Sequence, residues 1–90
     1  MNKDRRKAIA AVQEEIEKAQ GILAAAAEEL ETLKDEEQEY YDNMPAGPQE
    51  GEKGEKAQEA IDNMESAIDT LQTINDEIEE ALEGLNSAVE

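Results

Sequence analysis

The chain contains no cysteine, histidine, phenylalanine or tryptophan. Without cysteine and histidine it lacks the thiolate and imidazole groups on which most zinc, iron–sulfur and nucleophilic sites depend. It also cannot form a disulfide, so no feature points to an oxidising compartment. No apolar run approaches the roughly 20 residues of a membrane-spanning helix, and none follows the basic N-terminal residues as in a signal peptide. We therefore expect a soluble, cytoplasmic protein.

Basic residues are also scarce. The 90 residues include 8 Lys or Arg against 25 Asp or Glu, for a net charge of −17, and no basic residue follows Lys56. Residues 1–7 are the exception, with four basic side chains and one acidic one. Such an acidic surface repels phosphates, so we expect no direct contact with nucleic acid or with a membrane. Because this composition is also typical of disordered chains, the apolar pattern has to decide whether the chain folds.

Apolar residues recur at alternating steps of three and four in both halves of the chain. The first half carries Ile9, Val12, Ile16, Ala19, Leu23, Ala26, Leu30 and Leu33, then a polar Glu37, Tyr40 and Met44. The second half reads AIDNMES, AIDTLQT, INDEIEE and ALEGLNS from residue 60 onward. This spacing is typical of the a and d positions of coiled-coil helices. It predicts one helix over about residues 3–42 and another over about 55–88.

The predicted ends of these helices agree with the local sequence. Asn2 is a candidate N-cap for the first helix. Asn43 and Pro45 should end that helix, because Pro45 disfavours helical backbone at the preceding residue and has no amide hydrogen. The proline- and glycine-containing stretch over about 43–54 is expected to be a loop. We therefore expect a single domain over residues 1–90.

The short loop predicts an all-α fold in which the two helices form an antiparallel, coiled-coil-like hairpin. In such a hairpin, facing residues have a nearly constant sum of residue numbers. Pairing Leu33 with Met64 and Val12 with Leu85 keeps that sum at 97. In this alignment small residues of the first helix face large ones of the second, which favours interdigitated packing.

A hairpin covers only one stripe of each helix, and both helices have additional apolar positions. The second helix has a further row at Ala60, Ala67, Ile74, Ala81 and Ala88, and the first has Ile22 and the run 24–27. A stripe of three apolar positions per heptad can contact two neighbours. We expect self-association, as a homodimer or larger homo-oligomer, into a four-helix bundle. The alternative is a monomer with an exposed apolar flank.

Asn75 occupies a seam position opposite Leu23. It is either a polar contact that sets the register of the two helices or a solvent-facing residue beside Ile74.

Acidic residues cluster near the loop, but their spacing predicts no chemistry. The cluster comprises Glu36, Glu37, Glu39 and Asp42. It lacks the alternate acids and central glycine of a calcium loop, and no Glu-x-x-His pair is present for a di-iron site. The glycines and lysines of residues 47–56 do not have the spacing of a phosphate-binding loop. We therefore predict no catalytic residue, no metal, no cofactor and no enzymatic activity, and interpret the cluster as part of an acidic binding face.

The only two aromatic residues, Tyr40 and Tyr41, are adjacent at the start of the loop. Adjacent helical residues point about 100° apart, so only one can face the seam. Tyr40 is in register and is expected to close the core against Ala57 and Ile61, with Tyr41 turned outward. The loop is then either a packed turn or a recognition tip, because tyrosine is a favoured interface residue. The tip would consist of Tyr40, Tyr41, Asn43, Met44, Pro45 and Gln49.

These residues also carry a resemblance to known sequences. The stretch EYYDNMP at Glu39–Pro45, the following Gln49 and the sequence AIDNM at Ala60–Met64 resemble a group of small acidic helical-hairpin proteins encoded by bacteriophages and prophages. The group has no assigned activity, so the resemblance implies a phage origin and action in the host cytoplasm, but no catalytic or binding residue.

Three functions remain open on this sequence, besides a purely structural bundle. The first is a non-enzymatic inhibitor that blocks a host protein of antiphage defence or nucleic-acid handling through the acidic surface and the tip. The second is a mimic of DNA or RNA whose carboxylates fill a basic groove. The third is an oligomeric sponge for a signalling nucleotide, which needs convergent basic groups. The candidates for those groups near the loop are Lys53 and Lys56.

Overall fold

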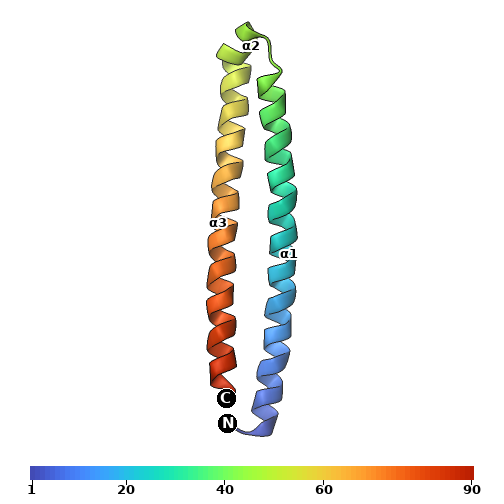
Figure 1. Ribbon diagram of the computed structural model, residues 1–90, viewed down its shortest axis with the longest axis vertical. Helices are drawn as coiled ribbons and strands as arrows, with labels where there is room; N and C mark the ends of the chain where they lie inside the picture. The colour runs from blue at the N-terminus through green and yellow to red at the C-terminus, as the bar shows by residue number, and fades with distance from the viewer.

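The computed structural model describes all residues 1–90 and contains only helices. Helix α1 spans Lys3–Asp42, α2 spans Ala46–Glu50 and α3 spans Glu52–Ala88. Helices α1 and α3 run antiparallel, side by side, and α2 lies at the end of the molecule opposite the two termini (Figure 1). The result is a rod with extents of 69 × 15 × 13 Å. None of the helices carries an apolar stretch sufficient to cross a bilayer.

Helix α1 has the predicted bounds, and its ends have clear local causes. Asn2 has extended backbone, and its side-chain oxygen accepts a hydrogen bond of 2.7 Å from the amide of Arg5. This bond satisfies one of the amides that a helix N-terminus leaves without a partner. At the other end, the amide of Met44 donates to the carbonyl of Tyr41 at 3.1 Å. The chain then leaves the helix at Pro45, which has no amide to donate.

The predicted loop is partly wrong, because residues 46–50 form the short helix α2 and α3 begins at Glu52, three residues before the predicted start. Pro48 is compatible with α2 because it lies in the first turn, where amides have no helical acceptor. The close approach of α2 to α3 depends on Gly54, which is buried. A Cβ atom at Gly54 would overlap the backbone carbonyl of Gln49.

The core of this hairpin is thin. Its buried apolar side chains are Ala57, Ile61, Ile68 and Leu82, all from α3, and α1 has no buried residue. The accessible surface is 6543 Å², whereas a compact monomer of 9.9 kDa exposes about 5,200 Å². A single hairpin therefore leaves much of its apolar surface exposed to water.

The predicted seam of α1 is wrong in one of its two rows. Helix α1 is rotated about its axis relative to the prediction, so that the residue after each member of that row is half-buried. We call these half-buried residues the inner row of α1: Gln13, Gln20, Ala27, Lys34 and Tyr41. The predicted row is exposed instead, and we call it the outer row of α1: Val12, Ala19, Ala26, Leu33 and Tyr40. Val12 and Leu33 are 47% and 52% exposed, so their pairings with Leu85 and Met64 do not form a sealed core. The two glutamines of the inner row donate hydrogen bonds to side chains of α3.

Candidate functional site

One face of the hairpin carries polar bridges between α1 and α3. The side-chain amide of Gln20 donates to Asn75 at 2.9 Å and to the carboxylate of Glu79 at 2.6 Å. The side-chain amide of Gln13 donates to Asn86 at 2.8 Å. These bonds set the register of the two helices and explain why α1 presents glutamines to α3. We call this side of the molecule the polar face.

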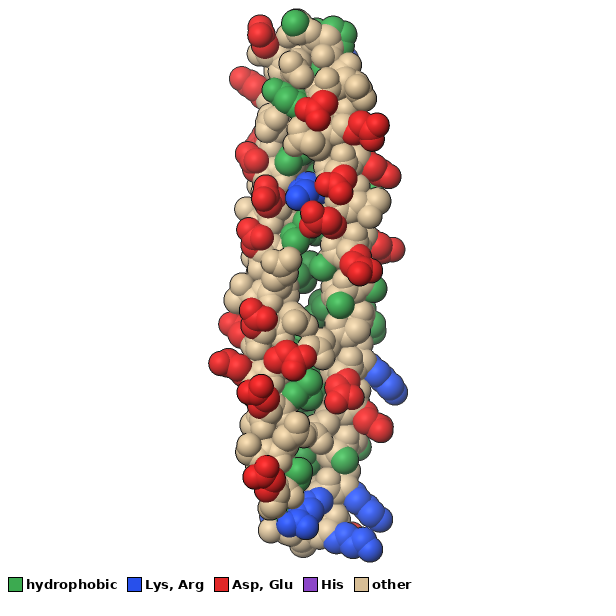
Figure 2. Space-filling view, in the orientation of Figure 1, with side chains coloured by type: hydrophobic (Ala, Val, Ile, Leu, Met, Phe, Trp, Pro, Cys, Tyr) green, Lys and Arg blue, Asp and Glu red, His purple; other side chains and the backbone are tan.

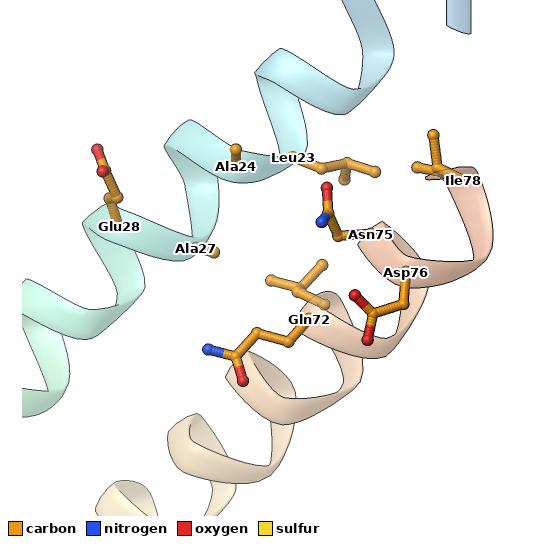
Figure 3. Close-up of a pocket in the computed structure, with 9 residues that line it drawn as sticks. Leu23, Ala24, Ala27, Glu28, Gln72, Asn75, Asp76 and Ile78 are labelled. Carbon is orange, nitrogen blue, oxygen red and sulfur yellow. The ribbon is translucent and has the colours of Figure 1, made fainter. Parts of the chain in front are cut away.

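A shallow groove lies near the middle of the polar face, between α1 and α3. Leu23 and Asn75 approach each other across it, whereas Glu28 and Gln72 point away from one another at the rim (Figure 3). Asn75 is exposed and accepts the bond from Gln20, so it is a polar contact between the helices rather than a core residue. No lysine or arginine lines the groove. The groove therefore has no positive group with which to hold an anion.

Carboxylates dominate the surface of the rod. Acidic side chains lie along both helices in Figure 2, and basic ones gather at the end that contains the N-terminus. Only two of the 25 acidic residues form an ion pair: Glu31 with Lys34 at 3.1 Å, and Glu52 with Lys56 at 3.5 Å. The hydrogen bond from Lys34 to Glu31, with Glu65 and Asp35 nearby, raises the pKa of Lys34 above its usual value. The interaction of Lys34 with Glu31 therefore contributes to the stability of the folded state throughout the neutral pH range. This contribution is lost only as the pH rises through the raised pKa of Lys34.

The predicted acidic cluster near the loop does not converge on a common point. Glu36, Glu39 and Asp42 are exposed, and Glu37 is half-buried. Asp42 accepts a hydrogen bond of 3.0 Å from Gln38, one turn earlier on the same helix. No group of three acidic side chains is placed to hold a metal ion. These carboxylates are spread along the end of α1 and are not gathered around one point.

The expected orientation of the two tyrosines is wrong. Tyr41 is half-buried, and its carbonyl accepts a hydrogen bond of 3.0 Å from the side chain of Gln49. Tyr40 is 54% exposed. The reason is the rotation of α1 about its axis described above. It places the inner row, which includes Tyr41, against α3 and leaves the outer row, which includes Tyr40, exposed. Tyr41 and Gln49 thus hold the turn together.

The remaining tip residues form a small depression at the loop end of the rod. We call it the tip depression, and its lining consists of Tyr40, Asn43, Met44, Pro45, Pro48 and Lys53. Tyr41 and Gln49 line a separate depression beside Gly54. The structure therefore divides the predicted tip into two groups, one that faces solvent in the tip depression and one that pins α2 to the helices.

Lys53 and Lys56 do not line a common depression. Lys53 lines the tip depression, whereas Lys56 lies outside it and is paired with Glu52. Both lysines are exposed.

The residues between the helices that the sequence did not predict are the glutamines of the polar face. A signal was present, because Gln13 and Gln20 are one heptad apart, and each has a polar residue of the second helix at a sum of 99: Asn86 and Glu79. The apolar residues at the neighbouring positions are the stronger signal and predict the other row of α1 as the seam.

Comparison with known proteins adds no assignment. No protein-family model, no curated protein and no solved structure matches this chain. The site has therefore to be interpreted from its own geometry: a long acidic rod with a polar face, an exposed apolar row and a tip depression.

Proposed function

We propose that this protein is a non-enzymatic inhibitor of phage origin that blocks a host protein by covering a basic surface with its polar face. The observation that carries the proposal is the set of acidic side chains left without a basic partner along the whole rod. Only two of 25 are in ion pairs. Unpaired charges of one sign steer a complementary surface into contact and set its orientation. The target class is a host protein of antiphage defence or of nucleic-acid handling, in keeping with the resemblance to phage sequences.

The polar face is preorganised for this contact. Gln13 and Gln20 tie α1 to α3 through side-chain bonds of 2.6 to 2.9 Å. The acidic residues beside these bonds are therefore presented from two helices in a constant register. A partner surface then meets charges that are already in place, which reduces the conformational entropy lost on binding.

We further propose that the hairpin self-associates into a four-helix bundle. The accessible surface exceeds that of a compact monomer of 9.9 kDa by about 1,300 Å². A stable interface removes about 800 Å² from each partner. The exposed outer row of α1 supplies apolar surface for such an interface.

The charge density favours mimicry of DNA or RNA as a second candidate. A net charge of −17 over 69 Å is one charge per about 4 Å, and two rods side by side have one per about 2 Å. Duplex DNA has one charge per about 1.7 Å of its axis. A bundle of two hairpins therefore approaches the field of a nucleic acid, and its target would be a basic groove that normally holds one. No comparable observation favours the nucleotide sponge.

The proposal is tested by capture of partners from bacterial lysate with three variants of the immobilised protein. Asp76 lines the groove of the polar face, and Asp62, Asp69 and Glu83 continue its row on α3 at intervals of seven residues. The face variant neutralises this row through Asp62→Asn, Asp69→Asn, Asp76→Asn and Glu83→Gln. The matched control removes four charges elsewhere, through Glu14→Gln, Glu15→Gln, Glu29→Gln and Glu77→Gln. The tip variant carries Tyr40→Ala and Met44→Ala.

We expect the wild type and the control variant to retain one partner, and the face variant to lose it. Release of that partner by high salt and by duplex DNA would identify the target as a nucleic-acid-binding protein. A partner that resists salt and is lost only with the tip variant would instead assign recognition to the tip depression. Absence of any captured protein would overturn both protein-binding functions.

A further inference from the structure

Two apolar rows lie on the side of the hairpin opposite the polar face. The first is the outer row of α1, defined above. The second, on α3, comprises Ala60, Ala67, Ile74, Ala81 and Ala88. The residue seven positions before the first member of each row is basic. It is Arg5 for the row of α1 and Lys53 for the row of α3. Tyr40 of α1 and Lys53 of α3 line the same depression, which places the two rows on a common side. We call this side the apolar face.

The apolar face has no acidic residue in either row, although acids make up 25 of the 90 residues. Rows without charge in so acidic a chain indicate a surface that is covered in the functional state. The excess accessible surface of about 1,300 Å² over a compact monomer is large enough for a standard interface, which takes about 800 Å² from each partner. The composition and the area both agree with one further neighbour.

The order of residues in each row identifies that neighbour as a second copy in reversed orientation. The row of α3 reads Ala, Ala, Ile, Ala, Ala and is symmetric about Ile74. The row of α1 is centred on Ala26, and reversal places Tyr40 opposite Val12 and Leu33 opposite Ala19 of the second copy. Each pair combines a larger with a smaller side chain, which suits interdigitated packing.

The two row centres also lie close to the same level along the rod. Residues of the segments 23–27 in α1 and 71–75 in α3 line a single groove. Ala26 and Ile74 fall within these segments. One two-fold axis perpendicular to the rod can therefore pass near both centres, as a closed dimer of identical chains requires.

The distribution of charge favours the reversed orientation over a parallel one. The loop half, residues 25–74, contains 15 acidic and 3 basic residues, a net charge of −12, and the terminal half has −5. A parallel pair would place two loop halves side by side. A reversed pair places the basic segment 1–7 of each copy beside the acidic loop end of the other, so that attraction replaces part of the repulsion.

We propose that a second copy of this chain covers the apolar face in antiparallel orientation, with α1 against α1 and α3 against α3 about a two-fold axis near Ala26 and Ile74. This inference rests on the proposed self-association and specifies its face and orientation. It assigns Tyr40 to the interface, opposite Val12 of the second copy. The polar faces of both copies remain open to a partner.

The natural absence of cysteine allows a test by single-cysteine crosslinking. Ala26→Cys is predicted to lie next to its own symmetry mate, within the Cα separation of about 4.4 to 6.8 Å that a disulfide requires. Ala24→Cys is the matched control, because Ala24 is also exposed but lines the groove of the polar face. Circular dichroism checks that both variants remain helical.

We expect mild oxidation to convert Ala26→Cys into a disulfide-linked dimer with a yield at least about tenfold above that of Ala24→Cys. An equimolar mixture of Ala19→Cys and Leu33→Cys should form the mixed dimer, whereas Ala19→Cys alone should not crosslink, because its symmetry mate lies about 21 Å away along the helix. Sedimentation of the cysteine-free wild type gives the oligomeric state independently.

The possible outcomes of these experiments distinguish this inference from the proposed self-association and the proposed inhibitory function. A wild type that sediments as a dimer while Ala24→Cys crosslinks in place of Ala26→Cys would overturn the face and leave self-association standing. A dimer in which neither Ala26→Cys nor the mixed pair crosslinks would overturn the antiparallel orientation. A wild type that remains monomeric at all concentrations would overturn self-association and this inference together, whereas loss of partner capture alone would overturn only the inhibitory function.

Discussion

At the scale of single residues, Gly54 decides how the loop end of the rod is closed. It is buried where α2 meets α3, and an added Cβ would overlap backbone atoms of Gln49. Backbone cannot move aside as a flexible side chain does, so α2 would have to shift as a unit. Gly84 offers the opposite situation, because its Cβ would meet open space on the surface of α3.

We predict that Gly54→Ala lowers the free energy of unfolding by about 1–3 kcal/mol, the range of a substitution that strains a packed backbone. Gly84→Ala should raise it by about 1 kcal/mol, because alanine favours a helix interior over glycine. Urea unfolding followed by circular dichroism measures both. A stabilising Gly54→Ala would show that α2 does not pack as described.

The two tyrosines differ by a single position and have different environments. Tyr40 is 54% exposed, whereas Tyr41 is half-buried beside the bond from Gln49. Because the chain has no tryptophan, its fluorescence reports on these residues alone.

We predict that acrylamide quenches Tyr40 (in Tyr41→Phe) more strongly than Tyr41 (in Tyr40→Phe) at low protein concentration. The quenching of Tyr40 should fall as the concentration rises, because association covers the apolar face. Equal quenching in the two variants at low concentration would contradict the observed orientation of α1, in which Tyr41 is half-buried and Tyr40 is exposed.

At the scale of elements, the main difference from the predicted hairpin is which rows of α1 pack against α3. Leu30 and Leu33 both belong to the predicted seam, but Leu30 is half-buried between the helices and Leu33 is 52% exposed. The inner row instead contains Gln20, whose amide bridges Asn75 and Glu79. The polar bridges occupy one side of the seam, and the outer row of α1 is left exposed.

These two leucines make a matched pair for a stability measurement. At protein concentrations below association, Leu30→Ala should lower the free energy of unfolding by about 1–2 kcal/mol, in proportion to the apolar area it removes from the seam. Leu33→Ala should change it by no more than about 0.5 kcal/mol. At high concentration Leu33→Ala should become destabilising, because it weakens the interface. A large loss for Leu33→Ala in the dilute monomer would show that the predicted seam is the correct one.

At the scale of the whole molecule, charge and shape act in opposite directions on association. The rod is thin, with an accessible surface of 6543 Å², and burial of its apolar face would favour the proposed second copy. The net charge of −17 on each copy opposes this. Salt reduces such repulsion, because the Debye length falls from about 30 Å at 0.01 M to about 8 Å at 0.15 M.

We predict that added sodium chloride strengthens self-association and raises the thermal midpoint in a way that depends on protein concentration. The same salt should weaken capture of a basic partner by the polar face. Sedimentation and partner capture, each measured across a salt series, should therefore show opposite trends. Association that weakens with salt would contradict a dimer held by apolar surface.

The sequence by itself determined the helices, their antiparallel arrangement and the ends of α1. A sustained heptad repeat favours helix over any other element, and a side-chain cap at Asn2 and a proline at position 45 specify where the first helix begins and ends. These are local effects that depend on residues close together in the chain. The short helix α2 was missed because it depends on Gly54 accepting a close backbone approach.

Only the tertiary structure decided which side of α1 faces α3. Neighbouring rows of a heptad differ by a modest rotation of the helix, and the apolar pattern of α1 favours the outer row, although the inner row is the one that packs against α3. The choice depends on what α3 presents across the seam, and the bonds from Gln13 and Gln20 join residues 55 to 73 positions apart. Contacts over that separation are set by packing and not by local pattern, which is why Tyr40 and Tyr41 exchanged their expected places.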